Sequence, residues 1–205
     1  MNQRLVWNFE FSNIKQPTLN YTIMESEPLK WEARYFWPED CIITLSAIEE
    51  GLLDLANYNQ KHKEDCYYII PAYDFNIKLR REELLYKPLV TKSKPLSICG
   101  FGHKHSLQDL EASEHASLND LKTIAELVAK AGIRIPVNKE SFTYKMTTEP
   151  SIKIELSHLE VFNTVYFSLC VEGKSFPLVE QISQSILGEK SSSNYTSFLK
   201  SLLKS

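Results

Sequence analysis

Charged side chains recur at every second position in several short segments of the chain. These positions are Lys30, Glu32 and Arg34; Lys63 and Asp65; Lys78 and Arg80; Lys153 and Glu155; and Glu172, which ends a further alternating segment. Because side chains along a β-strand point alternately to opposite faces, each segment would carry its charges on one face and apolar residues on the other. Ammonium and guanidinium groups match the oxygens of phosphate, and carboxylates bind hard divalent cations. The pattern therefore indicates a surface suited to anions, with carboxylates set among the cations.

Two arrangements would produce such faces. An open antiparallel sheet could pack one face on helices and leave the charged face in water. Alternatively, the sheet could roll into a wide barrel, with apolar residues outside and charges within. The number of segments that share the pattern supports the barrel. A lumen with several Lys and Arg residues would need an anionic partner, because like charges repel and desolvation is costly, and phosphate is the natural candidate.

Hydrophobic periodicity predicts the elements that must position these residues. Alternation predicts strands over 29–37, 63–70, 74–80, 83–89, 133–137, 141–147, 151–156 and 163–172, with a weaker one over 3–11. Helical spacing predicts helices over 43–57, 117–131, 176–188 and 194–204. The segment 90–116, which contains three histidines, is predicted to be a loop or an insertion. The simplest fold class is α+β, in one domain built on an antiparallel sheet.

Composition limits the function classes. With 43% hydrophobic residues, the 205-residue chain can bury a core, which excludes a wholly disordered protein. Lys plus Arg number 23 and Asp plus Glu number 26, and a net charge of −3 argues against a dedicated nucleic-acid binder. Among only 6 glycines, Gly100 and Gly102 alone lie close together, which disfavours a glycine-rich phosphate loop.

Cysteine spacing and hydropathy predict the compartment. The four cysteines, Cys41, Cys66, Cys99 and Cys170, form no C-x-x-C pair, so neither a zinc site nor a thioredoxin-type motif is supported. No apolar run approaches the roughly 18 residues of a membrane helix, and the first residues do not resemble a signal peptide. We therefore expect a reduced, cytoplasmic protein without a membrane partner.

Residues 61–87 and two other strands carry a resemblance to a known family. The matching residues are Asp65-Cys66-Tyr67-Tyr68, Pro71, Asp74, the basic strand Lys78-Leu79-Arg80, and Lys87. In this order they resemble the second segment of the CYTH superfamily, the triphosphate tunnel enzymes related to adenylate cyclase and thiamine triphosphatase. The segment 30–34 resembles the opening Glu-x-Glu-x-Lys strand of that family, and 166–172 resembles its final acidic strand. The resemblance covers about residues 28–175, and 176–205 would add C-terminal helices to the same domain.

The resemblance implies an eight-stranded antiparallel tunnel with flanking helices. It implies a hydrolase that acts on a triphosphate-containing small molecule, such as inorganic triphosphate or a nucleoside or thiamine triphosphate. The implied phosphate contacts are Arg34, Lys63, Lys78, Arg80, Lys87, Arg134, Lys145 and Lys153. The implied catalytic residues are Glu32, Asp65 and Glu172, and the implied ligands of Mg²⁺ or Mn²⁺ are Glu32, Glu155 and Glu172. Such an ion would polarise a phosphoryl oxygen or a water.

Departures from the family pattern keep a second function open. Lys30 stands where the family has its first glutamate, and Arg34 stands in place of its lysine. The final strand offers Ser168, Cys170 and Glu172, with one carboxylate where active members carry more. A hard cation with too few anionic ligands is weakly held. The alternatives are therefore a metal-dependent phosphohydrolase and a non-catalytic tunnel protein that binds a phosphorylated or other anionic ligand. A third is an α+β interaction domain with a solvated charged face.

Overall fold

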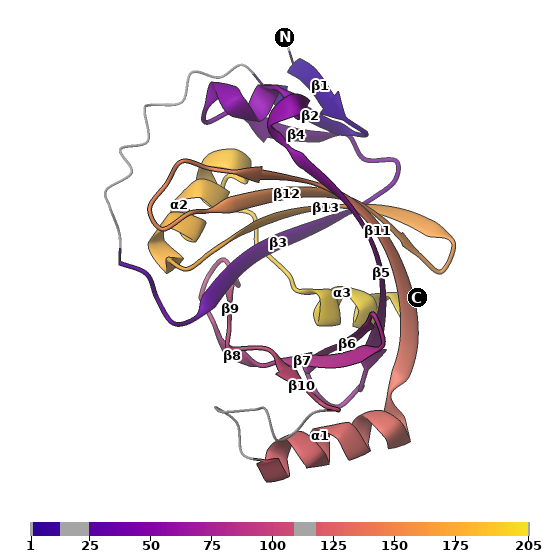
Figure 1. The fold of residues 1–205 in the computed structure, drawn as a ribbon. Helices are drawn as coiled ribbons and strands as arrows, with labels where there is room; N and C mark the ends of the chain where they lie inside the picture. The colour runs from indigo at the N-terminus through magenta and orange to yellow at the C-terminus, as the bar shows by residue number, and fades with distance from the viewer. Residues whose placement is uncertain (1, 13–24, 109–117, 205) are drawn as a thin grey trace.

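A ten-stranded sheet forms the body of the protein. The computed structural model describes residues 2–12, 25–108 and 118–204. In order across the sheet, the strands are β10 (His105–Ser106), β7 (Glu83–Lys87), β6 (Asn76–Arg80), β5 (Asn59–Ile69), β11 (Ile133–Lys145), β12 (Lys153–Val161), β13 (Thr164–Gly173), β3 (Lys30–Pro38), β9 (Cys99–Phe101) and β8 (Leu89–Lys92). All neighbours pair antiparallel. The sheet is strongly curled (Figure 1). An α+β fold with a curled antiparallel sheet, as the CYTH resemblance implies, is therefore confirmed.

The chain itself joins the two ends of the curled sheet. Strand β7 lies near one end of the strand order and β8 lies at the other, yet only Pro88 separates them in sequence. Proline has no N–H to give to a ladder, but its carbonyl oxygen accepts a hydrogen bond from the Gly102 amide at 3.0 Å. One nearly continuous segment therefore crosses from one end of the sheet to the other and completes a ring.

A small second sheet lies beside the ring. It contains β1 (Asn2–Val6), β2 (Phe9–Ser12) and β4 (Ile43–Ser46), and β4 pairs with β2 in parallel. Two 3₁₀ turns, η1 (Glu50–Leu53) and η2 (Leu55–Asn57), follow β4. The helix predicted over 43–57 is therefore wrong, because alternate residues of β4 are buried against β2 and tertiary pairing outweighs local helical spacing.

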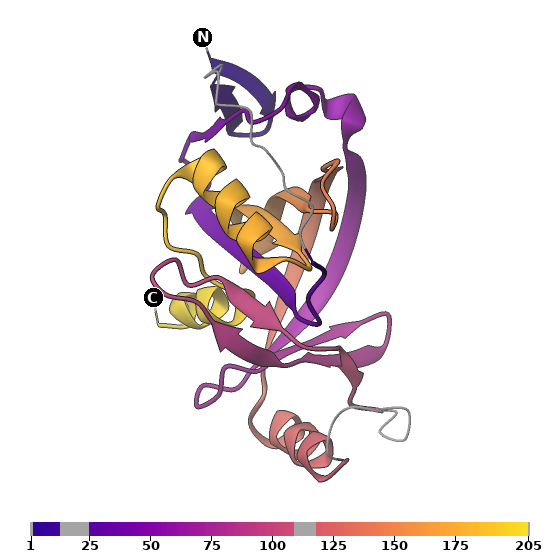
Figure 2. The same ribbon diagram turned by 90° about the vertical axis from the view of Figure 1, so that its left-hand side faces the viewer.

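Three helices complete the described fold. They are α1 (Leu118–Ala131), α2 (Phe176–Leu187) and α3 (Tyr195–Leu202). Helix α2 packs against β13, β3 and β4, on the outside of the ring (Figure 2). Asn194 is the N-cap of helix α3, and its side-chain oxygen accepts a hydrogen bond from the Ser197 amide at 2.8 Å. All three helices occur where helical spacing predicts them, with ends that differ by a few residues.

The faces of the strands separate apolar from charged residues as the barrel hypothesis requires. The main core, beneath α2 and the small sheet, takes the outward residues of β3, β12 and β13, among them Ala33, Ile154 and Leu169. A second outer cluster, under α1, includes Ile77, Leu121 and Val128. The charged faces of these strands point into the ring, so the open, solvated sheet is excluded for them.

Several boundaries differ from those predicted. Segments 133–137 and 141–147 belong to one long strand, β11, and segment 83–89 divides at Pro88 into β7 and β8. The predicted loop 90–116 contributes β8, β9 and β10 to the main sheet, while 109–117 lie outside the described residues. These short strands raise the count to ten where the resemblance implied eight. None of the helices in the described ranges has the length and apolar character needed to cross a membrane.

Candidate functional site

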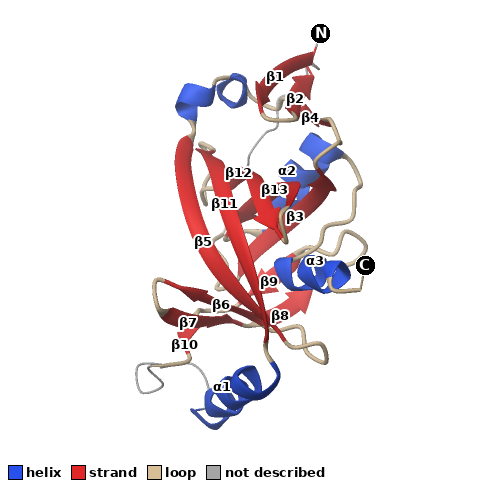
Figure 3. Ribbon diagram, turned by 90° about the vertical axis from the view of Figure 1, so that its right-hand side faces the viewer, coloured by secondary structure: helices blue, strands red, loops and turns tan. Residues whose placement is uncertain are grey.

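The inward faces of the strands surround a cavity of about 150 Å³. Its lining consists of Lys30, Glu32, Arg34, Lys63, Tyr67, Asn76, Lys78, Arg80, Leu85, Lys87, Lys104, Lys139, Glu155, Glu172 and Tyr195. Eight of these side chains are cationic and three are carboxylates. We call this region the cavity. Strands from opposite ends of the sequence supply it, because β3 is placed between β13 and β9 in the sheet (Figure 3).

Glu155 on β12 is the centre of one group of charges. Its carboxylate contacts the guanidinium of Arg34 at 3.2 Å and the ammonium of Lys139 at 2.8 Å, and Lys63 lies 3.9 Å away. The side chains of Arg34 and Lys139 are only 7% and 8% exposed. Burial alone would raise the pKa of Glu155, but Lys139, Arg34 and Lys63 outweigh burial and hold it well below its usual value. Glu155 is therefore ionised and shared among three cations.

Asp65 on β5 forms a second group with the basic hairpin β6–β7. Its two oxygens accept hydrogen bonds from Nε and Nη2 of Arg80, both at 2.5 Å, and from the ammonium of Lys78 at 3.1 Å. Burial would raise the pKa of Asp65, but Arg80 and Lys78 lower it overall. A bidentate Arg–carboxylate pair fixes the guanidinium plane, so Asp65 orients the two cations that face the cavity.

Two further carboxylates lie side by side near β9. Glu32 on β3 and Glu172 on β13 are direct partners across the strand pair. Lys87 donates a hydrogen bond to Glu32, and Lys30 lies 2.8 Å from Glu172. Burial would raise the pKa of Glu32, but Lys87, Arg34 and Lys30 lower it to about 2. Glu32 is therefore ionised, and each of the two carboxylates already holds an ammonium group.

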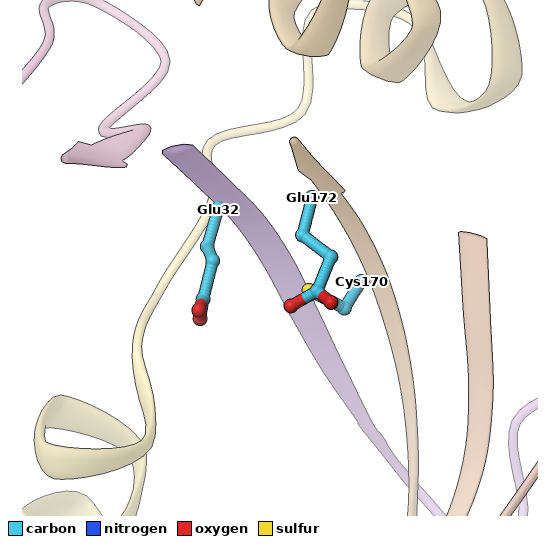
Figure 4. Close-up of side chains that lie close together, drawn as sticks. All are labelled: Glu32, Cys170 and Glu172. Atoms are coloured by element: carbon cyan, nitrogen blue, oxygen red, sulfur yellow. The ribbon is translucent and has the colours of Figure 1, made fainter. Parts of the chain in front are cut away.

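Glu32, Cys170 and Glu172 are the one group in the described residues whose donor atoms are close enough to share a metal ion. These atoms lie within 4.8 Å of one another (Figure 4). Burial raises the pKa of the Cys170 thiol strongly, so a neutral thiol, a poor ligand for a hard ion, fills the third position. Both carboxylates hold lysines, and Glu155, the third expected ligand, is committed to Arg34 and Lys139. The residues present therefore do not fit a Mg²⁺ or Mn²⁺ site.

Helix α3 lies inside the curve of the sheet (Figure 1), and its Tyr195 lines the cavity. Tyr195, Phe198 and Leu199 form a buried cluster with the inward apolar residues of β5, β11 and β12. The ring of Tyr195 stacks on Tyr67 with 4.9 Å between centroids, and the Arg34 guanidinium lies 4.7 Å from the centroid of the Tyr195 ring. The cavity therefore has an aromatic floor, which supports the most deeply buried cation by a cation–π contact.

Cations outnumber carboxylates in the cavity, and two of the lysines have a lowered pKa although each contacts a carboxylate. Burial, followed by the repulsion of Lys139, lowers the pKa of Lys63 to about 8 although Glu155 opposes the change. Burial also lowers the pKa of Lys78 to about 8, against the attraction of Asp65. The eight lining cations thus exceed the three lining carboxylates and Asp65 together. An anion in the cavity would relieve this repulsion.

Most residues expected from the resemblance come together here. Glu32, Arg34, Lys63, Lys78, Arg80, Lys87, Glu155 and Glu172 line the cavity, and Asp65 contacts two of them. Arg134 is exposed on β11, where its guanidinium lies 5.9 Å from the Tyr68 ring centroid. Lys145 and Lys153 are register partners on β11 and β12, and both are exposed and outside the lining.

Sequence reasoning missed Lys104, Lys139 and Tyr195. Lys139 falls between the two strands that the sequence predicted over 133–147. Had one continuous strand been predicted, alternation of side chains would have placed Lys139 on the same face as Lys145. Tyr195 belongs to an apolar helical stripe that indicates burial but not the surface it covers. Lys104 follows β9 in a segment predicted as a loop, and its sequence context carries no signal for the cavity.

Comparison with known proteins gives structural likeness only. No family model and no curated protein matches the chain. Among solved structures, HpAC1 from Hippeastrum, an adenylyl cyclase candidate described as having a dominant triphosphatase activity, is 11% identical with a TM-score of 0.45. An adenylate cyclase candidate from Bacillus halodurans is 12% identical with a TM-score of 0.38. The chain is thus similar to these two proteins over 76% and 78% of its length, and over 84% and 88% of theirs.

Proposed function

We propose that the protein binds a small molecule through a triphosphate or comparable phosphate chain, held inside the cavity. The observation that supports this most directly is the charge of the lining: eight cations line one cavity, with half as many carboxylates to balance them. Buried cations at this density repel one another unless an anion joins them. Guanidinium and ammonium groups together suit the several oxygens of a phosphate chain.

The composition of the lining indicates which part of a ligand the cavity would hold. Apart from Tyr67, Asn76, Leu85 and Tyr195, every side chain that lines it is charged. Such a lining suits a phosphate chain better than an apolar ring system. Any organic part of the ligand would therefore lie toward the open side, away from the floor that α3 forms with Tyr195.

Calorimetric titration with tripolyphosphate at neutral pH and low salt tests this proposal. We expect binding by the native chain and a loss of about tenfold or more in affinity for Arg80→Gln, because one bidentate donor disappears from the cavity. Lys122→Gln, which removes an exposed lysine on α1, serves as the matched control and should bind as the native chain does. Absence of binding by tripolyphosphate, pyrophosphate and ATP alike would refute the proposal.

Metal-dependent hydrolysis, the other function predicted from the sequence, stays a prediction. The same preparation tests it by release of inorganic phosphate in the presence of Mg²⁺ or Mn²⁺. The lysines held by Glu32 and Glu172 favour binding over hydrolysis, since they engage the carboxylates that such an ion would need. Release of inorganic phosphate that stops when EDTA is added would instead support metal-dependent hydrolysis over binding alone.

A further inference from the structure

Glu32 and Glu172 have the spacing of a cation site but hold two lysines. They are register partners on β3 and β13, and their donor atoms and the Cys170 sulfur all lie within 4.8 Å of one another. Figure 4 shows the three side chains on these neighbouring strands. Lys30 and Lys87 each give an ammonium group to one of them. Two ammonium groups carry the charge of one divalent ion, at the place where the carboxylates converge.

We propose that Lys30 and Lys87 take the place of a divalent cation, so that the cavity binds its ligand as a free polyphosphate anion that carries no metal ion. This inference rests on the proposed function and specifies the form in which that ligand binds. It assigns the two lysines a binding role, and Glu32 and Glu172 are their counter-ions in the ligand-free protein, with which the phosphates compete for the ammonium groups.

Low exposure makes the Lys87–Glu32 ion pair firm. The side chains of Lys87 and Glu32 are 12% and 14% exposed, whereas those of Lys30 and Glu172, nearer the open side, are 41% and 19% exposed. Lys87 also lies over the ring of Phe101, 4.2 Å from its centroid, so its ammonium group is held from two sides. Lys30 lies two residues before Glu32 on the same face of β3, which brings its chain alongside both carboxylates.

A divalent ion would meet three obstacles at this place. It would have to displace both ammonium groups, it would gain only the buried Cys170 sulfur, a soft donor, as a third ligand, and it would stand close to Arg34, whose charge acts on Glu32. A free polyphosphate anion would meet no such obstacle, because each of its negative charges is attracted to lysines that are already in place. Mg²⁺ bound to the phosphates would neutralise two of their charges and so reduce that attraction.

Calorimetric titration with tripolyphosphate, in EDTA and then in excess Mg²⁺, tests the inference. We expect tight binding in EDTA and affinity lower by about tenfold in Mg²⁺, since the metal removes the free anion. Binding that occurs only with Mg²⁺, or that Mg²⁺ strengthens, would overturn the inference and leave the proposed function standing. No binding in either condition would refute the proposed function itself, and this inference with it.

Two substitutions separate a lysine site from a metal site. Glu172→Gln removes a charge that repels phosphate and releases Lys30, so in EDTA we expect affinity to rise, on the order of 3- to 10-fold. Lys30→Gln should lower affinity by about the same factor. A metal site would show the reverse for Glu172→Gln, with affinity lost in Mg²⁺. Glu160→Gln, an exposed carboxylate on β12, is the control, and circular dichroism checks that each variant folds.

Discussion

Replacement of Glu155 by glutamine should destabilise the protein strongly, because this carboxylate is the shared partner of buried cations. Arg34 and Lys139 are 7% and 8% exposed, and Glu155 itself is 12% exposed. Removal of one partner from a buried ion pair costs about 3–5 kcal/mol, since the remaining charge is left uncompensated. Glutamine keeps a carbonyl oxygen that can accept one hydrogen bond, so we expect the lower end, about 3 kcal/mol.

Urea unfolding at neutral pH measures this loss. With a slope of about 2–3 kcal/mol/M for a chain of this length, the midpoint should fall by about 1–1.5 M while the slope is unchanged. Glu160→Gln, on the same strand but exposed, should stay within about 0.5 kcal/mol of the native chain. Saturating tripolyphosphate, at about 100 times its dissociation constant, should restore about 2.7 kcal/mol to the Glu155→Gln variant.

Equal stability of the Glu155→Gln and Glu160→Gln variants would refute the reasoning. That result would mean that Arg34 and Lys139 find other partners or reach water when the carboxylate is gone. A variant more stable than the native chain would mean that desolvation of Glu155 costs more than its three cations return. Either result would remove the premise that the cavity cations depend on an anion.

Three further outcomes are expected. Raising the pH from about 8 to about 10 should weaken tripolyphosphate binding and stabilise the ligand-free protein. The reason is that Lys63 and Lys78, with pKa values near 8, lose protons in the folded protein that the unfolded chain keeps. The affinity measured by calorimetry should therefore fall while the free energy of unfolding measured in urea rises, and a change of both in the same direction would contradict this. Phe198→Ala should lower the free energy of unfolding in urea by about 3–5 kcal/mol, because the Phe198 side chain stacks on Phe36 of β3 with 3.9 Å between ring centroids. A loss below about 1 kcal/mol would show that this contact does not hold α3 inside the curled sheet. Gly132→Ala should lower the free energy of unfolding by about 1–3 kcal/mol, because its Cβ would lie 2.5 Å from the carbonyl oxygen of Val128; an unchanged melting temperature would argue against that close approach.

Local patterns in the sequence reveal much of this fold. Strands β3, β6 and β13 appear at their predicted places because their charged and apolar residues alternate without interruption. The helix ends at α1 and α2 follow from helical spacing and from the glycines that come after them. The charged inner faces could be listed before the structure was known, because alternation fixes the face of each residue once the strand is known.

Features that depend on distant partners could not be predicted in the same way. The residues of β4 look helical in isolation and become a strand only because β2 offers them a parallel partner. Arg134 and Lys139 lie on the same strand, β11, but five positions apart, so their side chains point to opposite faces and Arg134 faces outward. The sequence predicted two separate strands over this segment, and the relative facing of the two residues could not be deduced from them. The position of α3 inside the ring depends on the shape of the whole sheet, which its apolar stripe does not encode.

The way the cavity is assembled has a consequence for synthesis of the protein. Arg34 reaches Glu155 across 121 residues and Ser168 across 134 residues, and its guanidinium rests on an aromatic ring from α3, near the C-terminus. Contacts between such distant parts of a chain form late and make folding slow. A nascent chain therefore has a cavity without its floor until α3 has left the ribosome, and a protein cut before Tyr195 would lose that floor along with the helix.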